Sequence, residues 1–391
     1  MSTTTTSGPG SVSGSGTEPG SGSGRDAAGR RGPGRAGRGR GARRAGKQGL
    51  WGWVFVSPMV LVLGLFLALP VGMALWVSLL NWDGQSNPFS GAADFVGLDN
   101  YRHLFADGGL TRTLFMTSLR NNLYYVLLVV PLQTALALGL ALAVNRRRLR
   151  GKGVFRTAFY FPSVTSSIAV STVFLFLFQS SGAVNSLLKW VGIQGPSWFT
   201  DARGLVWVVL GWVGLVDPGS PPAALAGHGV LGLSWWEWLS GPSVAMCTII
   251  FLVVWTTSGT FMLMFLAALQ DIPEAQLESA RIDGAGRWQT LRHVILPALR
   301  PVLFLVLTLG LIGTWQVFDQ VYVMSQGQPA NTTLTPAFLS YSLSFKDAQY
   351  GTGAAISFVL LAIILLMTGV QRLVLRERDG RRRLRPGRSA R

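Results

Sequence analysis

The stretch PEAQLESARIDGAGRWQTLRHVILP, residues 273–297, is a polar, amphipathic segment between two long apolar runs. Asp271 is placed to cap a helix, with Pro273 at an early helical position and Glu274 three residues after the cap. Because the apolar runs on both sides are long enough to enter a bilayer, the sequence predicts that this segment lies at the membrane face and does not cross it.

The predicted helix is interrupted in the middle of this segment. At Asp283-Gly284 the glycine accepts backbone angles that other residues resist, and a second short helix starts near Gly286. That helix carries apolar residues at helical spacing: Trp288, Leu291, Val294 and Ile295. Small residues would let another protein approach the backbone closely: Ala275, Ser279, Ala280, Gly284 and Ala285. We therefore predict a helix, turn and helix that form a contact surface; the alternative is an amphipathic loop without a partner.

Apolar runs dominate most of the remaining sequence. Of all residues 49% are hydrophobic and only 13% are charged, which is unlike a soluble domain. A bilayer core of roughly 30 Å needs about 20 helical residues, and several runs reach that length. We predict an all-α polytopic membrane protein with six transmembrane helices. These spans lie near residues 51–80, 119–144, 155–179, 242–269, 298–324 and 352–375.

The basic residues predict the orientation of these spans. Of the 34 Lys and Arg residues, 28 lie within four groups, at residues 25–47, 146–156, 281–300 and 372–391. Lys and Arg are retained on the cytoplasmic side of membrane proteins. All four groups share one side if six spans leave the N- and C-termini cytoplasmic. The net charge of +17 then suits anionic membrane lipid and not nucleic acid.

Part of the 273–297 segment matches a known signature. Glu278-Ser279-Ala280, then Gly284, then Ile295-Leu296-Pro297 resembles the cytoplasmic loop of binding-protein-dependent ABC importer permeases, with Ser279 in place of the usual alanine. The resemblance implies the type I ABC importer permease fold in a multi-pass protein of the cell (plasma or inner) membrane. It also implies a coupling loop that docks a separate ATPase through Glu278, Ser279, Ala280, Asp283, Gly284 and Ala285.

A second stretch narrows the resemblance to one branch of that family. Residues 315–324 and 327–335 resemble the fifth-helix region of the carbohydrate branch, as in the first permease of maltose-type and glycerol-phosphate-type importers. The implied function is a permease subunit of an ATP-driven sugar importer, for an oligosaccharide or a sugar phosphate, that works by alternating access. The implied partners are a second permease in a heterodimer, two ATP-binding cassette subunits and an extracytoplasmic solute-binding protein.

Composition divides the chain into several parts. Residues 1–48 are rich in Gly, Ser, Thr and Arg, and they predict a disordered cytoplasmic tail that is not a signal peptide. The first transmembrane helix and an outer loop occupy 49–113, and the permease core occupies 114–376 with the coupling loop at 271–297. A basic cytoplasmic tail covers 377–391.

An outer insert at residues 180–241 departs from the family, which has a short connection there. Its apolar stretch 205–216 is too short to span a membrane, and its tryptophans favour the membrane interface. We predict a re-entrant or surface-lying element that contacts the solute-binding protein; the alternative is that it only packs on the bundle. A spanning hairpin here would give eight helices without changing the side of the coupling loop.

Polar residues inside the predicted spans are candidates for the substrate path, because polar groups in a membrane are costly unless they face a cavity or a partner. The preferred candidates are Gln316, Asp319, Gln320 and Tyr322, since 316 and 320 share a helix face. Tyr322, Phe318 and Trp315 are candidates to stack on sugar rings. The alternative for Asp319 is a place near the outer interface of the membrane, where a carboxylate costs little. Weaker candidates are Gln133, Ser163, Thr165, Ser166, Ser167, Thr256, Thr257, Ser258, Thr308 and Thr314.

The sequence contains no catalytic motif. His103, His228 and His293 lie far apart and are expected at the surface, Cys247 is the only cysteine, and Gly151-Lys152-Gly153 lacks the spacing of a phosphate-binding loop. We therefore predict no catalytic residue, metal site or cofactor, and a protein that is not an enzyme. Two alternatives to a sugar permease stay open: an ABC importer permease for another solute, and a membrane enzyme or channel.

Overall fold

The computed structural model describes residues 52–91, 93–146, 150–214, 225 and 227–380. The chain divides into two compact units, Met1–Phe66 and Leu67–Arg391. Helices dominate the described residues, and two short antiparallel hairpins are added: β1 (Leu80–Asn81) with β2 (Asp94–Phe95), and β3 (Gly229–Val230) with β4 (Leu233–Ser234). The predicted tail 1–48 lies outside the described residues, and so does most of the tail 377–391.

The first candidate span runs from Gly52 to Val77 and includes the π-helical turn η1 (Gly64–Ala68) and α2 (Leu69–Val77). None of the residues in its most apolar window is buried. Large apolar side chains such as Phe55 and Phe66 are 82% and 74% exposed. This surface suits lipid and agrees with the span predicted at 51–80.

Four helices are long and apolar enough to cross a membrane, and two bent helix pairs bring the total to six among the described residues. The other three straight spans are α4 (Leu110–Val144), α11 (Val244–Gln270) and α18 (Tyr350–Gly380, apolar to Val374). The first bent pair is α5 (Lys152–Val164) with α6 (Ser167–Leu177), which meet at 98°. This bent pair corresponds to the predicted third span, 155–179.

The predicted fifth span, 298–324, is also interrupted. Helix α15 (Arg300–Trp315) ends near the middle of the predicted range, and α16 (Asp319–Met324) begins after a short break. The second bent pair consists of α15 and the segment before it, Arg287–Ala298, which meet at 73°. Because the helix ends at Trp315, the prediction that Gln316 and Gln320 share one helix face was wrong.

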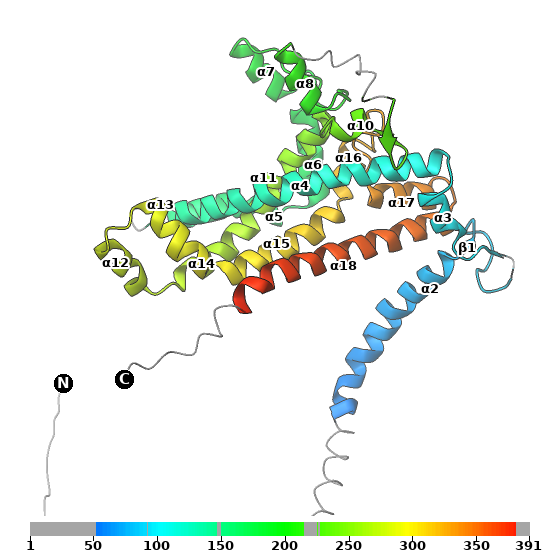
Figure 1. The fold of residues 1–391 in the computed structure, drawn as a ribbon, viewed down its shortest axis with the longest axis horizontal. Coiled ribbons are helices and arrows are strands. Elements are labelled where there is room, and N and C mark those ends of the chain that lie inside the picture. The colour runs from blue at the N-terminus through cyan, green and yellow to red at the C-terminus, as the bar shows by residue number, and fades with distance from the viewer. Residues whose placement is uncertain (1–51, 92, 147–149, 215–224, 226, 381–391) are drawn as a thin grey trace, which may run out of the picture. The chain divides into compact units, whose positions relative to one another are not determined.

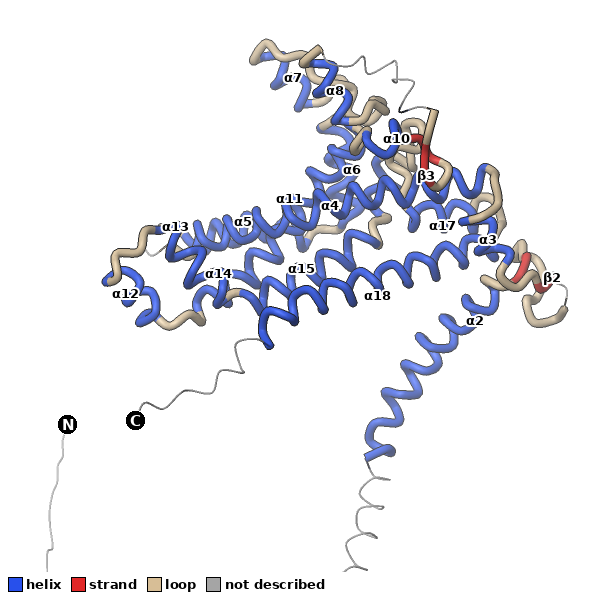
Figure 2. The backbone as a smooth tube through the Cα atoms, viewed as in Figure 1, coloured by secondary structure: helices blue, strands red, loops and turns tan. Residues whose placement is uncertain are grey.

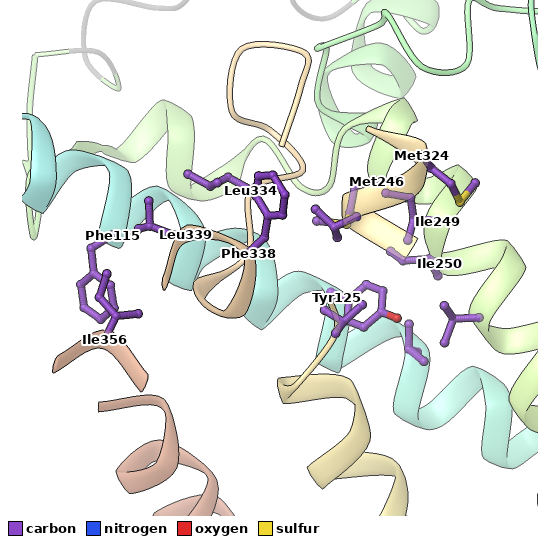
Figure 3. Close-up of a cluster of buried hydrophobic side chains, with 14 of the residues drawn as sticks. Phe115, Tyr125, Met246, Ile249, Ile250, Met324, Leu334, Phe338, Leu339 and Ile356 are labelled. Atoms are coloured by element: carbon purple, nitrogen blue, oxygen red, sulfur yellow. The ribbon is translucent and has the colours of Figure 1, made fainter. Parts of the chain in front are cut away.

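The interior of the second unit is built around α4 and α11, which contact each other along their length (Figures 1 and 2). One cluster of buried side chains joins these helices to α16, α18 and the short helix α17 (Pro336–Phe345). Phe115 and Tyr125 of α4 are each 1% exposed, and Met246 and Ile249 of α11 are fully buried (Figure 3). Helix α17 was not predicted from the sequence.

Helices α5 and α11 approach each other closely at Gly259. A Cβ atom on this residue would lie 2.2 Å from the carbonyl oxygen of Phe159, which is a distance that real side chains do not reach. Small residues at helix interfaces allow such an approach in membrane proteins. The contact places the C-terminal end of α5 beside the middle of α11.

One end of the second unit carries the predicted helix, turn and helix (Figure 1). Asp271 ends α11 there and does not cap the following helix, and Pro273 precedes that helix instead of lying inside it; both details of the prediction were wrong. Asp271 and Ile272 form the turn that leads out of α11 before α12 begins. The segment consists of α12 (Glu274–Ile282), α13 (Arg287–Thr290), the π-helical turn η2 (Leu291–Ile295) and α14 (Leu296–Ala298).

The opposite end carries α3, α17 and the β1–β2 hairpin; in the outer insert α10 lies toward this end, whereas α7 and α8 project from the side of the bundle (Figure 1). The described part of the insert contains three short helices, and the apolar stretch predicted to be too short to span forms only an eight-residue helix. Arg120 of α4 donates to the carbonyl oxygen of Glu237 at 3.3 Å, and Tyr124 donates to that of Trp238, so this part of the insert is anchored to the bundle. Besides α17, the short helices of this part of the unit are α3 (Asp99–Phe105), α7 (Ala183–Trp190), α8 (Leu205–Trp212) and α10 (Trp235–Leu239).

Candidate functional site: two adjoining clefts at the broken helices

The larger of two clefts in the second unit has a volume of about 380 Å³. It lies where α5 gives way to α6, beside α11 and α15. Pro162 is close to this break, and Thr165 has extended backbone angles that end the helix. Serine and threonine residues supply most of its polar surface. The lining residues that were predicted from the sequence are Ser163, Thr165, Ser167, Thr256, Thr257 and Gln320.

The smaller cleft, of about 230 Å³, surrounds the break between α15 and α16. Gln316, Phe318, Asp319 and Gln320 all line it, together with Gln133 and Thr314 from the weaker candidates. Four residues line both clefts, so the two adjoin: Thr257, Phe261, Leu309 and Gln320.

A side-chain hydrogen bond joins the two helix breaks. Gln320, in the first turn of α16, donates from Nε2 to the hydroxyl oxygen of Ser167, the first residue of α6, at 2.9 Å. The two residues are 153 positions apart in sequence. Interrupted helices in transporters expose backbone and polar groups where a substrate passes. The meeting of two such interruptions therefore makes these clefts the strongest candidate for a substrate site.

Gln133 of α4 connects the clefts to the centre of the bundle. Its side chain is 1% exposed, and its Oε1 accepts a hydrogen bond from the hydroxyl of Thr257 at 2.7 Å. Its Nε2 has no hydrogen-bond partner among the described residues and faces Gly310, where a Cβ would lie 2.5 Å away. A side chain at position 310 would therefore have to displace this amide.

The structure places the preferred path residues in two different surroundings. Gln316, Asp319 and Gln320 come together at the smaller cleft, whereas Tyr322 lines neither cleft. The ring of Tyr322 instead stacks on Phe318 at 5.5 Å and packs edge-on against Tyr341 of α17 at 5.5 Å. Trp315 is 3% exposed and packs in the core, so its predicted contact with a sugar ring was wrong for this structure.

Three weaker candidates do not line the clefts. Ser166 and Ser258 are outside both linings, and Thr308 accepts a hydrogen bond from Gln371 of α18 at 3.0 Å. Ser171 and Thr260 line the larger cleft but were not predicted. Thr260 lies four residues after Thr256 and so shares its helix face, a signal that was available in the sequence.

The predicted coupling residues form the exposed tip of the 274–298 segment. Glu278, Ser279 and Asp283 are exposed, Gly284 has a φ of +75° that favours glycine, and nothing lies within 4 Å of its missing Cβ. Ala280 is the buried member, and its carbonyl accepts a hydrogen bond from the amide of Ala285 at 2.9 Å. The turn is therefore closed by the backbone of this chain, while its surface stays free.

Two large apolar side chains flank this turn without a covering contact. Ile282 is 85% exposed and Trp288 is 69% exposed. On an otherwise polar surface, such residues are typical of a protein contact. The same segment is held from behind, because Leu277 and Ile295 pack against a buried cluster that includes Leu269 and Leu299.

Comparison with known families identifies the chain. Residues 135–379, which contain the exposed turn and most residues that line the clefts, match the family described as "Binding-protein-dependent transport system inner membrane component". The chain belongs to this family. It is therefore a multi-pass protein of the cell membrane and a transport component, not an enzyme.

Relatives within the family extend over most of the chain. A lactose transport system permease protein of Rhizobium radiobacter is 30% identical, over 84% of this chain and 94% of the relative. A multiple sugar-binding transport system permease protein of Streptococcus mutans is 29% identical, over 82% of this chain and 93% of the relative. A trehalose/maltose transport system permease protein of Thermococcus litoralis is also 29% identical, over 82% and 92%.

The fold has a solved counterpart. A chain of a bacterial ABC transporter involved in the import of the acidic polysaccharide alginate superposes with a TM-score of 0.63 at 21% identity, over 86% of this chain and 98% of that chain. The likeness supports the type I importer permease fold that the signature implied.

Proposed function

We propose that this chain is the membrane-spanning permease subunit of an ATP-driven sugar importer and that the two clefts form its half of the substrate path. The observation that carries the proposal is the meeting of two interrupted helices at adjoining polar clefts. The carbohydrate relatives and the family membership support a sugar as the solute.

The clefts suit a sugar in chemical terms. Glutamine side chains donate and accept, hydroxyls do both, and a carboxylate accepts, so together they match the hydroxyl groups of a sugar. We infer that Gln316, Asp319 and Gln320 contact the solute. Phe318 offers an aromatic surface in the same cleft, and Tyr322 supports Phe318 from behind, since the two rings are stacked.

The exposed turn of the 274–298 segment is the proposed docking site for a separate ATPase. Glu278, Ser279, Ala280, Asp283, Gly284 and Ala285 form this tip, with Ile282 and Trp288 as apolar neighbours. Movement of the docked ATPase would act on both adjoining spans, because α12 follows α11 and α14 precedes α15. The broken helices then change their relative positions, which alternates access to the clefts.

We infer that the end carrying α12 to α14 faces the cytoplasm. The C-terminal end of α18 lies at that same end (Figure 1), and the basic groups at 281–300 and 372–391 then share one side. The proposed organisation is a basic tail at 1–48, a first span with outer loop at 49–113, a permease core at 114–376 and a second tail at 377–391.

The proposed assembly contains a second permease, two ATP-binding cassette subunits and an extracytoplasmic solute-binding protein. The insert 180–241 is proposed to contact the binding protein, since it is anchored to the first half of α4, away from the 274–298 segment (Figure 1). We infer that the second permease completes the path, since Gln316 and Asp319, which line the smaller cleft, are exposed in this chain.

Uptake measurements test the proposed function. Cells in which the gene is deleted, and the same cells with the gene restored, are supplied with radiolabelled lactose, maltotriose, trehalose, arabinotriose, putrescine and leucine. We expect gene-dependent, ATP-dependent uptake of at least one carbohydrate. Gene-dependent uptake of putrescine or leucine alone would replace sugar by another solute, and purification of the membrane complex without an ATPase would contradict an importer.

A further inference from the structure

Asp319 is the only charged residue among the described residues that line the two clefts. The other polar lining residues are glutamines, serines and threonines, and no Lys, Arg or His contributes to these two linings. Asp319 is exposed at the start of α16, and its carboxylate makes no hydrogen bond or ion pair within the part of the chain that the structure describes. The clefts therefore carry one negative charge without a positive partner.

The surroundings of Asp319 make this charge effective. Val317 beside it is 5% exposed, and the smaller cleft combines neutral polar side chains with apolar surface from Tyr125, Val253, Phe261, Leu309 and Phe318. A charge acts more strongly beside apolar walls than in water, and a cleft lined by one sign of charge focuses its field on whatever enters. Gln316 and Gln320 on either side are neutral, so the net charge of the cleft lining stays negative.

The charge discriminates between classes of carbohydrate. A neutral sugar donates its hydroxyl hydrogens to the carboxylate and exchanges hydrogen bonds with the amides. A uronic acid or a sugar phosphate places an anion next to Asp319 and finds no cation in the described lining, and like charges placed side by side oppose binding. Sugar phosphates were among the solutes that the signature implied, so the charge separates possibilities that the family leaves open.

We propose that Asp319 makes this path selective for uncharged carbohydrates over those that carry carboxylate or phosphate groups. The inference deepens the proposed function and rests on it. The fold itself does not impose the choice, since the alginate importer named above shares it.

The first experiment measures the field directly and does not require the solute. Cys247, the only cysteine, is replaced by alanine, and Gln316→Cys places one thiol in the smaller cleft. The assembled transporter is labelled with a cationic and an anionic methanethiosulfonate reagent, and the ratio of the two rates is divided by the ratio for free cysteine. We expect this normalised ratio to favour the cationic reagent and to fall at least about fivefold with Asp319→Asn.

Two further variants keep this measurement interpretable. Asp319→Glu retains the charge and should retain the ratio. Asp347→Asn removes an exposed carboxylate that lies outside both clefts and should leave the ratio unchanged. A ratio that does not change when Asp319→Asn replaces the carboxylate by an amide would overturn the proposal, as would an equal loss in the Asp347→Asn protein.

The second experiment uses transport. Galactotriose and trigalacturonate differ in their carboxylates, and each competes for uptake of the sugar that the deletion strain identifies. We expect wild-type uptake to be inhibited by galactotriose at least about tenfold more strongly, and the preference to shrink with Asp319→Asn. Stronger inhibition by trigalacturonate would overturn the inference. If no carbohydrate is taken up, the proposed function fails, whereas the labelling ratio still reports whether the cleft is negative.

Discussion

The 274–298 segment and the pair of clefts differ in how the chain builds them. The segment is one stretch of consecutive residues, and its exposed turn depends on local features, chiefly Gly284 at a φ of +75°. The clefts combine α4, α5, α6, α11, α15 and α16, and the bond that joins their breaks connects positions 153 residues apart. The exposed turn can thus be specified by consecutive residues, whereas the clefts require the packing of several helices that are distant in sequence.

The largest effect is expected at the turn. Gly284→Val places a β-branched residue at a positive φ, which costs about 1–3 kcal/mol and also adds bulk at the proposed ATPase contact. We expect ATP-driven uptake to fall at least about 100-fold while the protein still inserts in the membrane.

The matched control for this variant is Gly139→Val in α4. Gly139 also has open space around its missing Cβ but does not have a positive φ. Uptake and the amount of membrane-inserted protein are measured for both. Normal uptake by the Gly284→Val protein would remove the turn from the coupling mechanism.

A smaller but distinct effect is expected where the bundle shapes the larger cleft. Gly259→Val drives a side chain into the carbonyl oxygen of Phe159, which lies 2.2 Å from the place that the new Cβ would take, and so forces α5 away from α11. We expect the yield of monodisperse protein in detergent to fall about tenfold, with Gly139→Val again as the control. An unchanged yield and melting temperature would show that the close approach is dispensable.

Two substitutions in α16 separate the cleft from the aromatic side chains behind it. Gln320→Leu removes the bond to Ser167 and a polar group from both clefts, and we expect transport to fall about fivefold. Tyr322→Leu keeps an apolar side chain outside the clefts, and we expect a loss of about twofold. Initial uptake rates at equal expression decide; a larger loss for Tyr322→Leu would place the path on the α17 side of α16.

The smallest effect is expected from the N-terminal tail. Removal of residues 2–45 deletes a Gly-, Ser- and Arg-rich sequence with little to bury, so uptake should stay within about twofold of the full chain. Copurification of the partner subunits is measured in parallel. Failure of assembly would show that the tail contributes a contact.

The sequence predicted those features that depend on local composition. Six apolar regions, the polar 274–298 segment and the interruption at Gly284 are visible as runs of one residue type or as a single glycine. Surface placement of His103, His228 and His293 was also predicted, and all three are exposed.

The remaining features depend on contacts between distant residues. The predicted spans 155–179 and 298–324 each contain a break, near Thr165 and near Val317, whose position hydropathy alone does not give. Aspartate is a residue type that often caps the start of a helix, but here α11 extends to Gln270 and Asp271 is its C-terminal cap. Trp315 lies among polar residues in sequence and yet packs in the core, because its helix turns that face toward α4 and α18.

The bond between Gln320 and Ser167 joins two neutral side chains at 2.9 Å. Such a bond contributes about 0.5–1.5 kcal/mol, which corresponds to a bias of only about two- to tenfold between its closed and open forms. Thermal motion therefore opens it readily, without help from nucleotide hydrolysis. A hydrogen bond of this strength holds the starts of α6 and α16 together between transport cycles. It adds little to the activation barrier of each cycle.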